Sequence, residues 1–203
     1  MKNFIVIIAI LLFGCSDNGP IKTEFTNIKK LTVDDHRDFT KSKDSLISLL
    51  PKMKAESLDC NADIYWRIIC RGQSSIPLLI ESLTDTTSTN VYNHCKNGKL
   101  NVAEVSYFAL EELAEFPAFL VTQIQYDVYD ENGCWSFFDD FFDNSTKKSY
   151  QKKIMEFYNS NNYVFVKFNN EELNACRKKY KIYGKLKLKE YYQPLTSTFA
   201  HAE

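Results

Sequence analysis

Residues 101–113 read NVAEVSYFALEEL, and the predicted architecture is built around this segment. Asn101 and Glu104 have the spacing of a capping box, in which each side chain accepts a hydrogen bond from the backbone N–H of the other residue. Apolar side chains then cover much of the helix circumference, with Val102, Val105, Ala109 and Leu113 on one side and Phe108 and Leu110 beside them. A helix with so wide an apolar surface is expected to lie between other helices.

Helical patterns also precede and follow this segment. Asn61 is expected to cap a helix that ends at Gly72, and Pro77 lies in the first turn of the next helix, where its missing N–H is no loss. Further helices are expected over residues 41–53, from Ser145 to Tyr158, and from a second capping box at Asn169 and Glu172 to Gly184. Residues 163–168 read as a short strand or as packed extended chain. The predicted class is mainly α, with one weak strand as the only β element considered.

Two of these segments carry a resemblance to a repeat family. Residues 72–85, GQSSIPLLIESLTD, resemble the second helix of a HEAT repeat, where a glycine turn and an Ile-Pro-x-Leu opening lead to an apolar helix. Residues 101–113 are similar to the first helix of the next repeat. The resemblance covers about residues 61–115 and implies a short helical array that binds other macromolecules. The sequence departs from the family by inserting residues 86–100 where repeats have a short turn, and by lacking a further clear repeat.

The N-terminus carries a targeting signal. Lys2 is followed by the ten-residue apolar run 4–13, which is shorter than the ~20 residues that a membrane-spanning helix needs and fits a secretory leader. Leu12-Phe13-Gly14-Cys15 resembles a bacterial lipobox. The resemblance implies cleavage after Gly14 and lipid attachment through a thioether on Cys15. The alternative is an ordinary secretory leader with an incidental cysteine.

The predicted organisation follows from this signal. Residues 1–14 are a signal peptide, 15–40 a lipidated tether, 41–184 a single helical domain and 185–203 a frayed, basic tail. In the best-known sorting rule for bacterial lipoproteins, aspartate after the lipidated cysteine retains the protein in the inner membrane. Ser16 therefore favours the outer membrane, with the periplasmic face and the cell surface both left open.

The cysteine count predicts disulfides. The chain has six cysteines, and lipidation of Cys15 leaves five in a compartment that permits disulfides. Two disulfides and one thiol are the simplest outcome, although sequence does not fix the connectivity. Cys95 and Cys134 both lie in polar, loop-like stretches and are expected to pair.

The remaining cysteines are assigned by elimination. Cys70 lies in an apolar helical stretch and is expected to be a buried thiol, which leaves Cys60 to pair with Cys176. No CxxC or HxxxH spacing occurs, so a structural metal is not expected.

An aromatic and acidic stretch is the candidate binding region. Residues 126–142 read YDVYDENGCWSFFDDFF, and most of these rings are expected to be core or to cover a helix. A Cys95–Cys134 disulfide would join this stretch to the inserted loop 86–100. An ordered polar insertion of this length costs conformational entropy and is more often functional than ornamental. The candidate partner contacts are Tyr92, Asn93, Asp127, Tyr129, Asp130 and Trp135.

These features predict a lipid-anchored binding module of the cell envelope that has no catalysis of its own and no cofactor. The expected partners are the membrane, through Cys15, and another envelope protein or a glycan. Net charge is −1, from 25 basic and 26 acidic residues, which argues against a nucleic-acid binder. One alternative is an envelope hydrolase that uses the acidic cluster around Asp127 and Asp130. Another is an immunity-type protein that masks a toxin.

Overall fold

The chain combines helices with two small sheets. The computed structural model describes residues 46–116, 129–160 and 162–189. This part is about 49% helix and 18% strand, and the strands form two separate antiparallel pairs. The prediction of a mainly α, HEAT-like helical array is therefore wrong, and the fold is mixed α/β.

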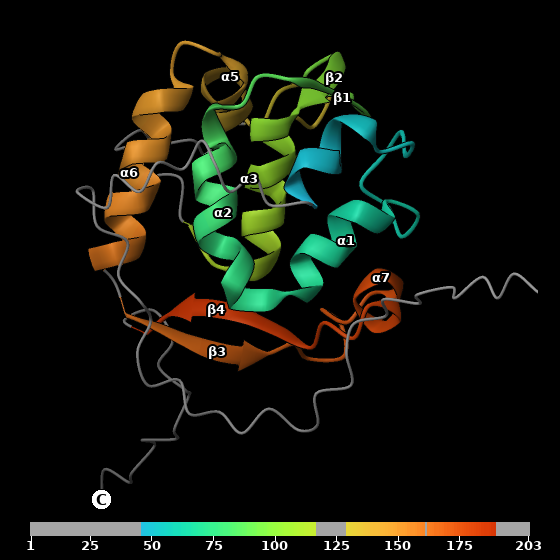
Figure 1. The fold of residues 1–203 in the computed structure, drawn as a ribbon, viewed down its shortest axis with the longest axis vertical. Helices are drawn as coiled ribbons and strands as arrows, with labels where there is room; N and C mark the ends of the chain where they lie inside the picture. The colour runs from blue at the N-terminus through green and yellow to red at the C-terminus, as the bar shows by residue number, and fades with distance from the viewer. Residues whose placement is uncertain (1–45, 117–128, 161, 190–203) are drawn as a thin grey trace, which may run out of the picture.

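The segment 101–113 forms the central helix, α3 (Val102–Leu113). Its capping box is confirmed, because the Asn101 side chain accepts from the Glu104 backbone N at 3.0 Å and the Glu104 carboxylate accepts from the Asn101 backbone N at 2.8 Å. Helix α3 packs against α1 (Asp63–Cys70) and α2 (Ile76–Glu81), and α6 (Lys147–Ser160) packs against α2 (Figure 1). The predicted burial of α3 between other helices is thus correct.

Short elements complete the helical part. They are three 3₁₀ helices, η2 (Ile47–Lys52), η3 (Gly72–Ser75) and η4 (Ser82–Thr84), and two short α-helices, α5 (Phe137–Phe142) and α7 (Ala175–Lys179). The final helix is much shorter than predicted. Asn169 and Glu172 do exchange capping-box hydrogen bonds, but they close a turn, and α7 begins after Asn174 instead.

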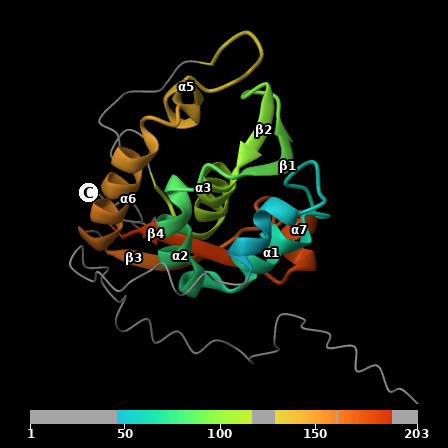
Figure 2. The ribbon, with the colours of Figure 1, turned by 45° about the horizontal axis from the view of Figure 1, so that its top comes forward.

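The insertion between α2 and α3 is a β-hairpin, not an irregular loop. Strand β1 (Ser88–Asn93) pairs with β2 (Gly98–Asn101), and β2 leads directly into α3 (Figure 2). Asn97 adopts a left-handed backbone, with φ of 50°, in the turn before Gly98. Side chains of β1 alternate, so Thr89 and Val91 are buried while Asn90 and Tyr92 are exposed.

The second sheet closes the opposite end of the helices (Figure 1). Strand β3 (Tyr163–Lys167) pairs with β4 (Gly184–Leu188), so the strand interpretation of residues 163–168 is correct. Strand β4 lies where a frayed tail is predicted, and that prediction is wrong for residues 185–188, because Leu186 and Leu188 are buried. The rest of the predicted tail, 190–203, lies outside the described residues.

Gly184 belongs to this sheet and does not end a helix. A β-carbon at Gly184 would overlap the Phe165 ring and the Val166 carbonyl, so β4 approaches β3 too closely there for any larger residue. The sheet is joined to α3 through a backbone hydrogen bond of 3.0 Å from Glu115 N to Leu186 O.

Much of the aromatic stretch is core, as predicted. Phe137 and Phe141 of α5 are buried against Tyr107 of α3, with ring centroids 5.6 Å and 4.4 Å from the tyrosine ring. Tyr150 of α6 completes the cluster, 5.9 Å from Tyr107. These rings hold α5 and α6 against α3, on the side of the molecule where the β1–β2 hairpin lies.

Candidate functional site

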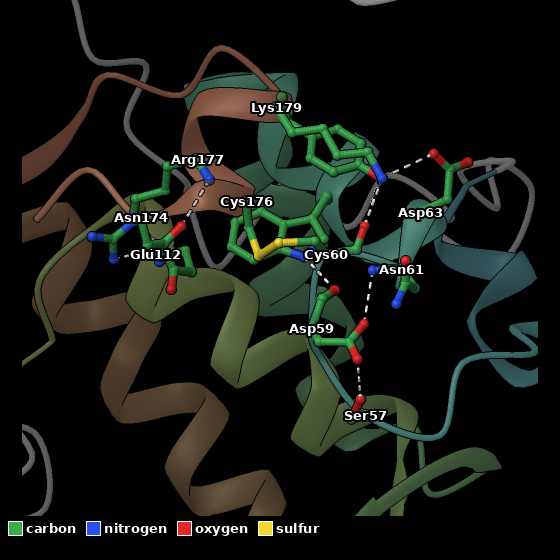
Figure 3. Close-up of a disulfide and its surroundings, with 12 residues drawn as sticks. Ser57, Asp59, Cys60, Asn61, Asp63, Glu112, Asn174, Cys176, Arg177 and Lys179 are labelled. Atoms are coloured by element: carbon green, nitrogen blue, oxygen red, sulfur yellow. Dashed lines mark hydrogen bonds and ion pairs between the residues drawn. A yellow bond between two sulfur atoms is a disulfide. The ribbon is translucent and has the colours of Figure 1, made fainter.

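Two disulfides join parts of the chain that are far apart in sequence. Cys95–Cys134 links the turn of the β1–β2 hairpin to the segment before α5, and Cys60–Cys176 links the segment before α1 to α7 (Figure 3). Both pairings are the ones predicted from the sequence. Their presence fits an extracellular or periplasmic location.

Cys70 differs from the prediction that it is a buried thiol. It is disulfide-bonded, so the prediction of a buried thiol is wrong. Cys15, the predicted lipidation site, lies outside the described residues.

The Cys95–Cys134 bond brings two exposed tyrosines onto connected segments. Tyr92 on β1 is 52% exposed, and Tyr129 on the segment that leads to Cys134 is 66% exposed. Both are predicted partner contacts, and both rings are accessible. Asp127, another candidate, lies outside the described residues.

Three other candidates hold the loops in shape. The Asn93 side chain accepts from the Cys95 backbone N at 2.9 Å, and the Asp130 carboxylate accepts from the Cys134 backbone N at 2.7 Å. Trp135 is half-buried, and its ring centroid lies 5.1 Å from that of Phe137. These side chains hold the segments that carry Tyr92 and Tyr129 in place.

The surroundings of Asp130 bear on the hydrolase alternative. The hydrogen bond from the Cys134 backbone, helped by one from Asn132, holds the pKa of Asp130 below its usual range. A general acid of a hydrolase needs the opposite shift, because it must carry a proton near neutral pH. The geometry of Asp130 is that of a turn-forming carboxylate.

A shallow cleft borders Tyr92. It has a volume of about 400 Å³ and is lined by Lys54, Glu56, Asn90, Tyr92 and Lys99. The Tyr92 backbone N donates to Glu56 O at 2.8 Å, which fastens β1 to the segment after η2, and Lys99 Nζ donates to Asn90 Oδ1 at 3.2 Å. An aromatic ring beside lysines and an amide can contact a polar or anionic ligand. Four of these residues were not among the sequence candidates.

A buried ionic cluster joins the hairpin to the helices. The fully buried Glu104 carboxylate accepts from Lys96 Nζ at 2.7 Å and from Lys147 Nζ at 3.2 Å. Lys147 is 4% exposed and also donates to the Phe141 carbonyl at 3.0 Å. Burial lowers the pKa of Lys147, and attraction to Glu104 opposes that effect. The cluster joins the hairpin turn, α3, α5 and α6 at one point.

His94 lies directly beside the surface disulfide. Its Nε2 is 3.2 Å from Cys95 Sγ. Ligand atoms of His94, Cys95 and Cys134 lie within 4.8 Å of one another, the arrangement of a potential metal site. Both sulfurs are bonded to each other in the disulfide, so in this oxidised state only the His94 imidazole could bind a metal ion.

No family model, no curated protein and no solved structure matches the chain. Within the described residues, no helix is long and apolar enough to cross a membrane.

Proposed function

We propose that the protein is a lipid-anchored binding module of the cell envelope, and that its partner contacts the surface of Tyr92 and Tyr129. The observation that carries this proposal is the Cys95–Cys134 disulfide, which ties the exposed face of the hairpin to the segment of Tyr129. The partner class is another envelope protein or a glycan.

The energetics of the hairpin support this proposal. Ordering its backbone costs ~1–2 kcal/mol per residue, and much of its outer face buries nothing in return. The hairpin is nevertheless held by the disulfide, by the Lys96–Glu104 ion pair and by the hydrogen bond from Tyr92 N to Glu56 O. Exposed tyrosines on a rigid base lose little entropy on binding, and tyrosine is enriched among the residues that dominate interfaces.

The binding proposal predicts a specific loss of partner contact in the double variant Tyr92→Ala, Tyr129→Ala. Each truncation of a central interface tyrosine costs ~1–2 kcal/mol, so the two together should weaken binding by roughly thirty- to several hundredfold while the melting temperature stays unchanged. The measurement is photo-crosslinking in intact envelopes followed by mass spectrometry, with binding to purified peptidoglycan fragments as the glycan arm.

Tyr183 provides the matched control for this experiment. It is also 52% exposed, but it lies next to β4, at the opposite end of the helices from the hairpin (Figure 1). Tyr183→Ala should leave partner capture unchanged. Equal capture by the double variant and the wild type, with both folded, would show that this surface is not the binding face.

The anchoring proposal rests on the lipobox and predicts that Cys15→Ser abolishes acylation. The variant should lose metabolic labelling with a radioactive or clickable fatty acid, and it should remain uncleaved or leave the detergent-soluble membrane fraction. Unchanged labelling contradicts the proposal. So does a mature N-terminal peptide whose mass changes on reduction, because a sulfur in a disulfide cannot carry the thioether.

The outer membrane is the proposed destination, on the basis of Ser16. Sucrose-gradient fractionation of the labelled protein tests this step separately, and protease treatment of intact cells separates the periplasmic face from the cell surface. Recovery with the inner membrane would contradict the assignment without affecting the proposed anchor.

A further inference from the structure

The two described disulfides have similar exposure but different neighbours. Cys95, Cys60 and Cys176 are all half-buried, and Cys134 is 9% exposed. The Cys95 sulfur has the imidazole of His94 at 3.2 Å. At the other bond, Lys179 Nζ and Tyr180 OH donate to the Cys60 carbonyl oxygen, at 2.9 Å and 3.4 Å (Figure 3). A titratable ring therefore contacts a sulfur of the first bond, whereas these two polar groups contact the backbone at the second.

His94 has a carboxylate and a sulfur among its neighbours. Asp130, from the segment that carries Cys134, interacts electrostatically with His94. The nearest cation in sequence, Lys96, is directed to the Glu104 carboxylate, where its charge is compensated. The His94 ring nitrogen is within hydrogen-bond distance of the Cys95 sulfur, and the ring also interacts with the Asp130 carboxylate.

We propose that Cys95–Cys134 is a thiol-exchange site for external thiols, in which His94 stabilises the Cys95 thiolate. A ring N–H that donates a hydrogen bond to a thiolate stabilises the charged form of the cysteine and thereby the reduced state. Stabilising the reduced form makes a disulfide easier to open at a given redox poise. His94 acts as a positioning residue, because its effect passes through the charge on Cys95.

The reaction balances without any further reagent. A thiolate of the external thiol attacks one sulfur of the pair, forms a mixed disulfide with it and displaces the other cysteine as a thiolate. A second thiolate attacks the mixed disulfide, releases the second cysteine and leaves as the oxidised external disulfide. The net change is one protein disulfide and two thiols converted to one protein dithiol and one external disulfide.

Opening this bond would act on the proposed binding surface. It would release the hairpin turn from the segment of Tyr129, while Cys60–Cys176 and the Glu104 cluster would keep the helices in place. The inference itself does not depend on the proposed function, because its experiment measures cysteines and not partners.

The test places the folded full-length protein in glutathione buffers of graded ratio at pH 7, followed by acid quenching, alkylation and peptide mapping of each cysteine. Cys95 and Cys134 should become alkylated at a reduced-to-oxidised ratio at least tenfold lower than Cys60 and Cys176. His94→Gln should require about tenfold more reducing conditions for Cys95–Cys134 only, which corresponds to ~30 mV. Lys179→Gln is the matched control beside the other bond and should leave Cys95–Cys134 unchanged.

Three outcomes would overturn the inference. They are opening of both bonds at one ratio, opening of Cys60–Cys176 first, and a potential of Cys95–Cys134 that is the same in His94→Gln as in the wild type. Each readout is a ratio measured within one folded chain, so a general loss of stability cannot imitate the expected result.

Discussion

Replacing both Cys60 and Cys176 by serine is expected to lower the free energy of unfolding by ~4–5 kcal/mol, because the bond closes a loop of 116 residues in the unfolded chain. A loss of this size approaches the total stability of a small domain, so the variant should unfold at much lower denaturant. Chemical unfolding followed by circular dichroism measures the effect.

The same region has contacts that survive the substitution. Arg177 forms an ion pair of 2.8 Å with Glu112 of α3, and Tyr180 stacks on Trp66 of α1 with ring centroids 5.9 Å apart. Helix α7 should therefore stay docked in the folded variant, and the loss should come mainly from the unfolded state.

An unfolded-state origin has a signature of its own. An unfolded chain without the cross-link is more expanded, so the denaturant dependence of the free energy should become steeper in the variant. The matched control is Cys95→Ser with Cys134→Ser, which opens a loop of 39 residues and should cost ~1 kcal/mol less. A loss below ~1 kcal/mol for the Cys60 and Cys176 variant would contradict the prediction.

The sequence predicts the helices better than the strands. Helix α3 can be predicted from thirteen consecutive residues, because its capping box and its apolar surface are both patterns of neighbouring residues. The strand β4 also has a local signal, the alternation of Lys185-Leu186-Lys187-Leu188, but its lysines make it resemble a solvated tail. Its partners are β3, about twenty residues earlier, and Ala114, about seventy residues earlier, and a local pattern cannot reveal such pairings.

The β1–β2 hairpin was also predicted only in part. Asn97-Gly98 is a turn signal in the sequence, although Gly98 pairs with Asn93 and the turn is formed by residues 94–97, and the flanking strands are so polar that their alternation is weak. Tyr92 and Tyr129 could be selected as surface residues from composition and the expected disulfide. Lys54, Glu56 and Lys99 could not, because the cleft is made by separate segments that meet only in the folded chain.

The buried ionic cluster of Lys96, Glu104 and Lys147 could not be predicted from the sequence either, because its residues come from separate segments. Its loss is expected to have the second large effect on stability. Glu104→Gln should destabilise the protein by ~3–5 kcal/mol, because it leaves the ammonium of Lys147 buried without its counter-charge. Glutamine keeps the size of the side chain and can still cap Asn101, so the loss reports the charge and not the cap. Thermal and denaturant unfolding at pH 7 measure it.

Lys147→Met is the matched variant and should cost less than Glu104→Gln. It leaves the Glu104 carboxylate bonded to Lys96 and to the Asn101 backbone, whereas its own methylene chain is replaced by a similar apolar one. Combining Glu104→Gln with Lys147→Met removes the stranded ammonium, and Lys96 is partly exposed, so its charge can turn to solvent. The double variant should therefore be more stable than the sum of the single effects predicts, by ~1 kcal/mol or more.

The pH dependence separates this charge effect from a packing defect. Glu104 is the main group that offsets the desolvation lowering the pKa of Lys147, and Asp143 contributes less, so the pKa of this amine should fall further in Glu104→Gln. The unfolded chain then binds more protons than the folded chain at alkaline pH, and the stability of Glu104→Gln should rise relative to the wild type as the pH approaches the ordinary lysine value. In Glu104→Gln combined with Lys147→Met this rise should vanish, because the titrating group is gone. A stability difference that is the same at pH 7 and at pH 9.5 would mean that glutamine disturbs the packing around α3, and that the buried charge of Lys147 is not what Glu104 compensates.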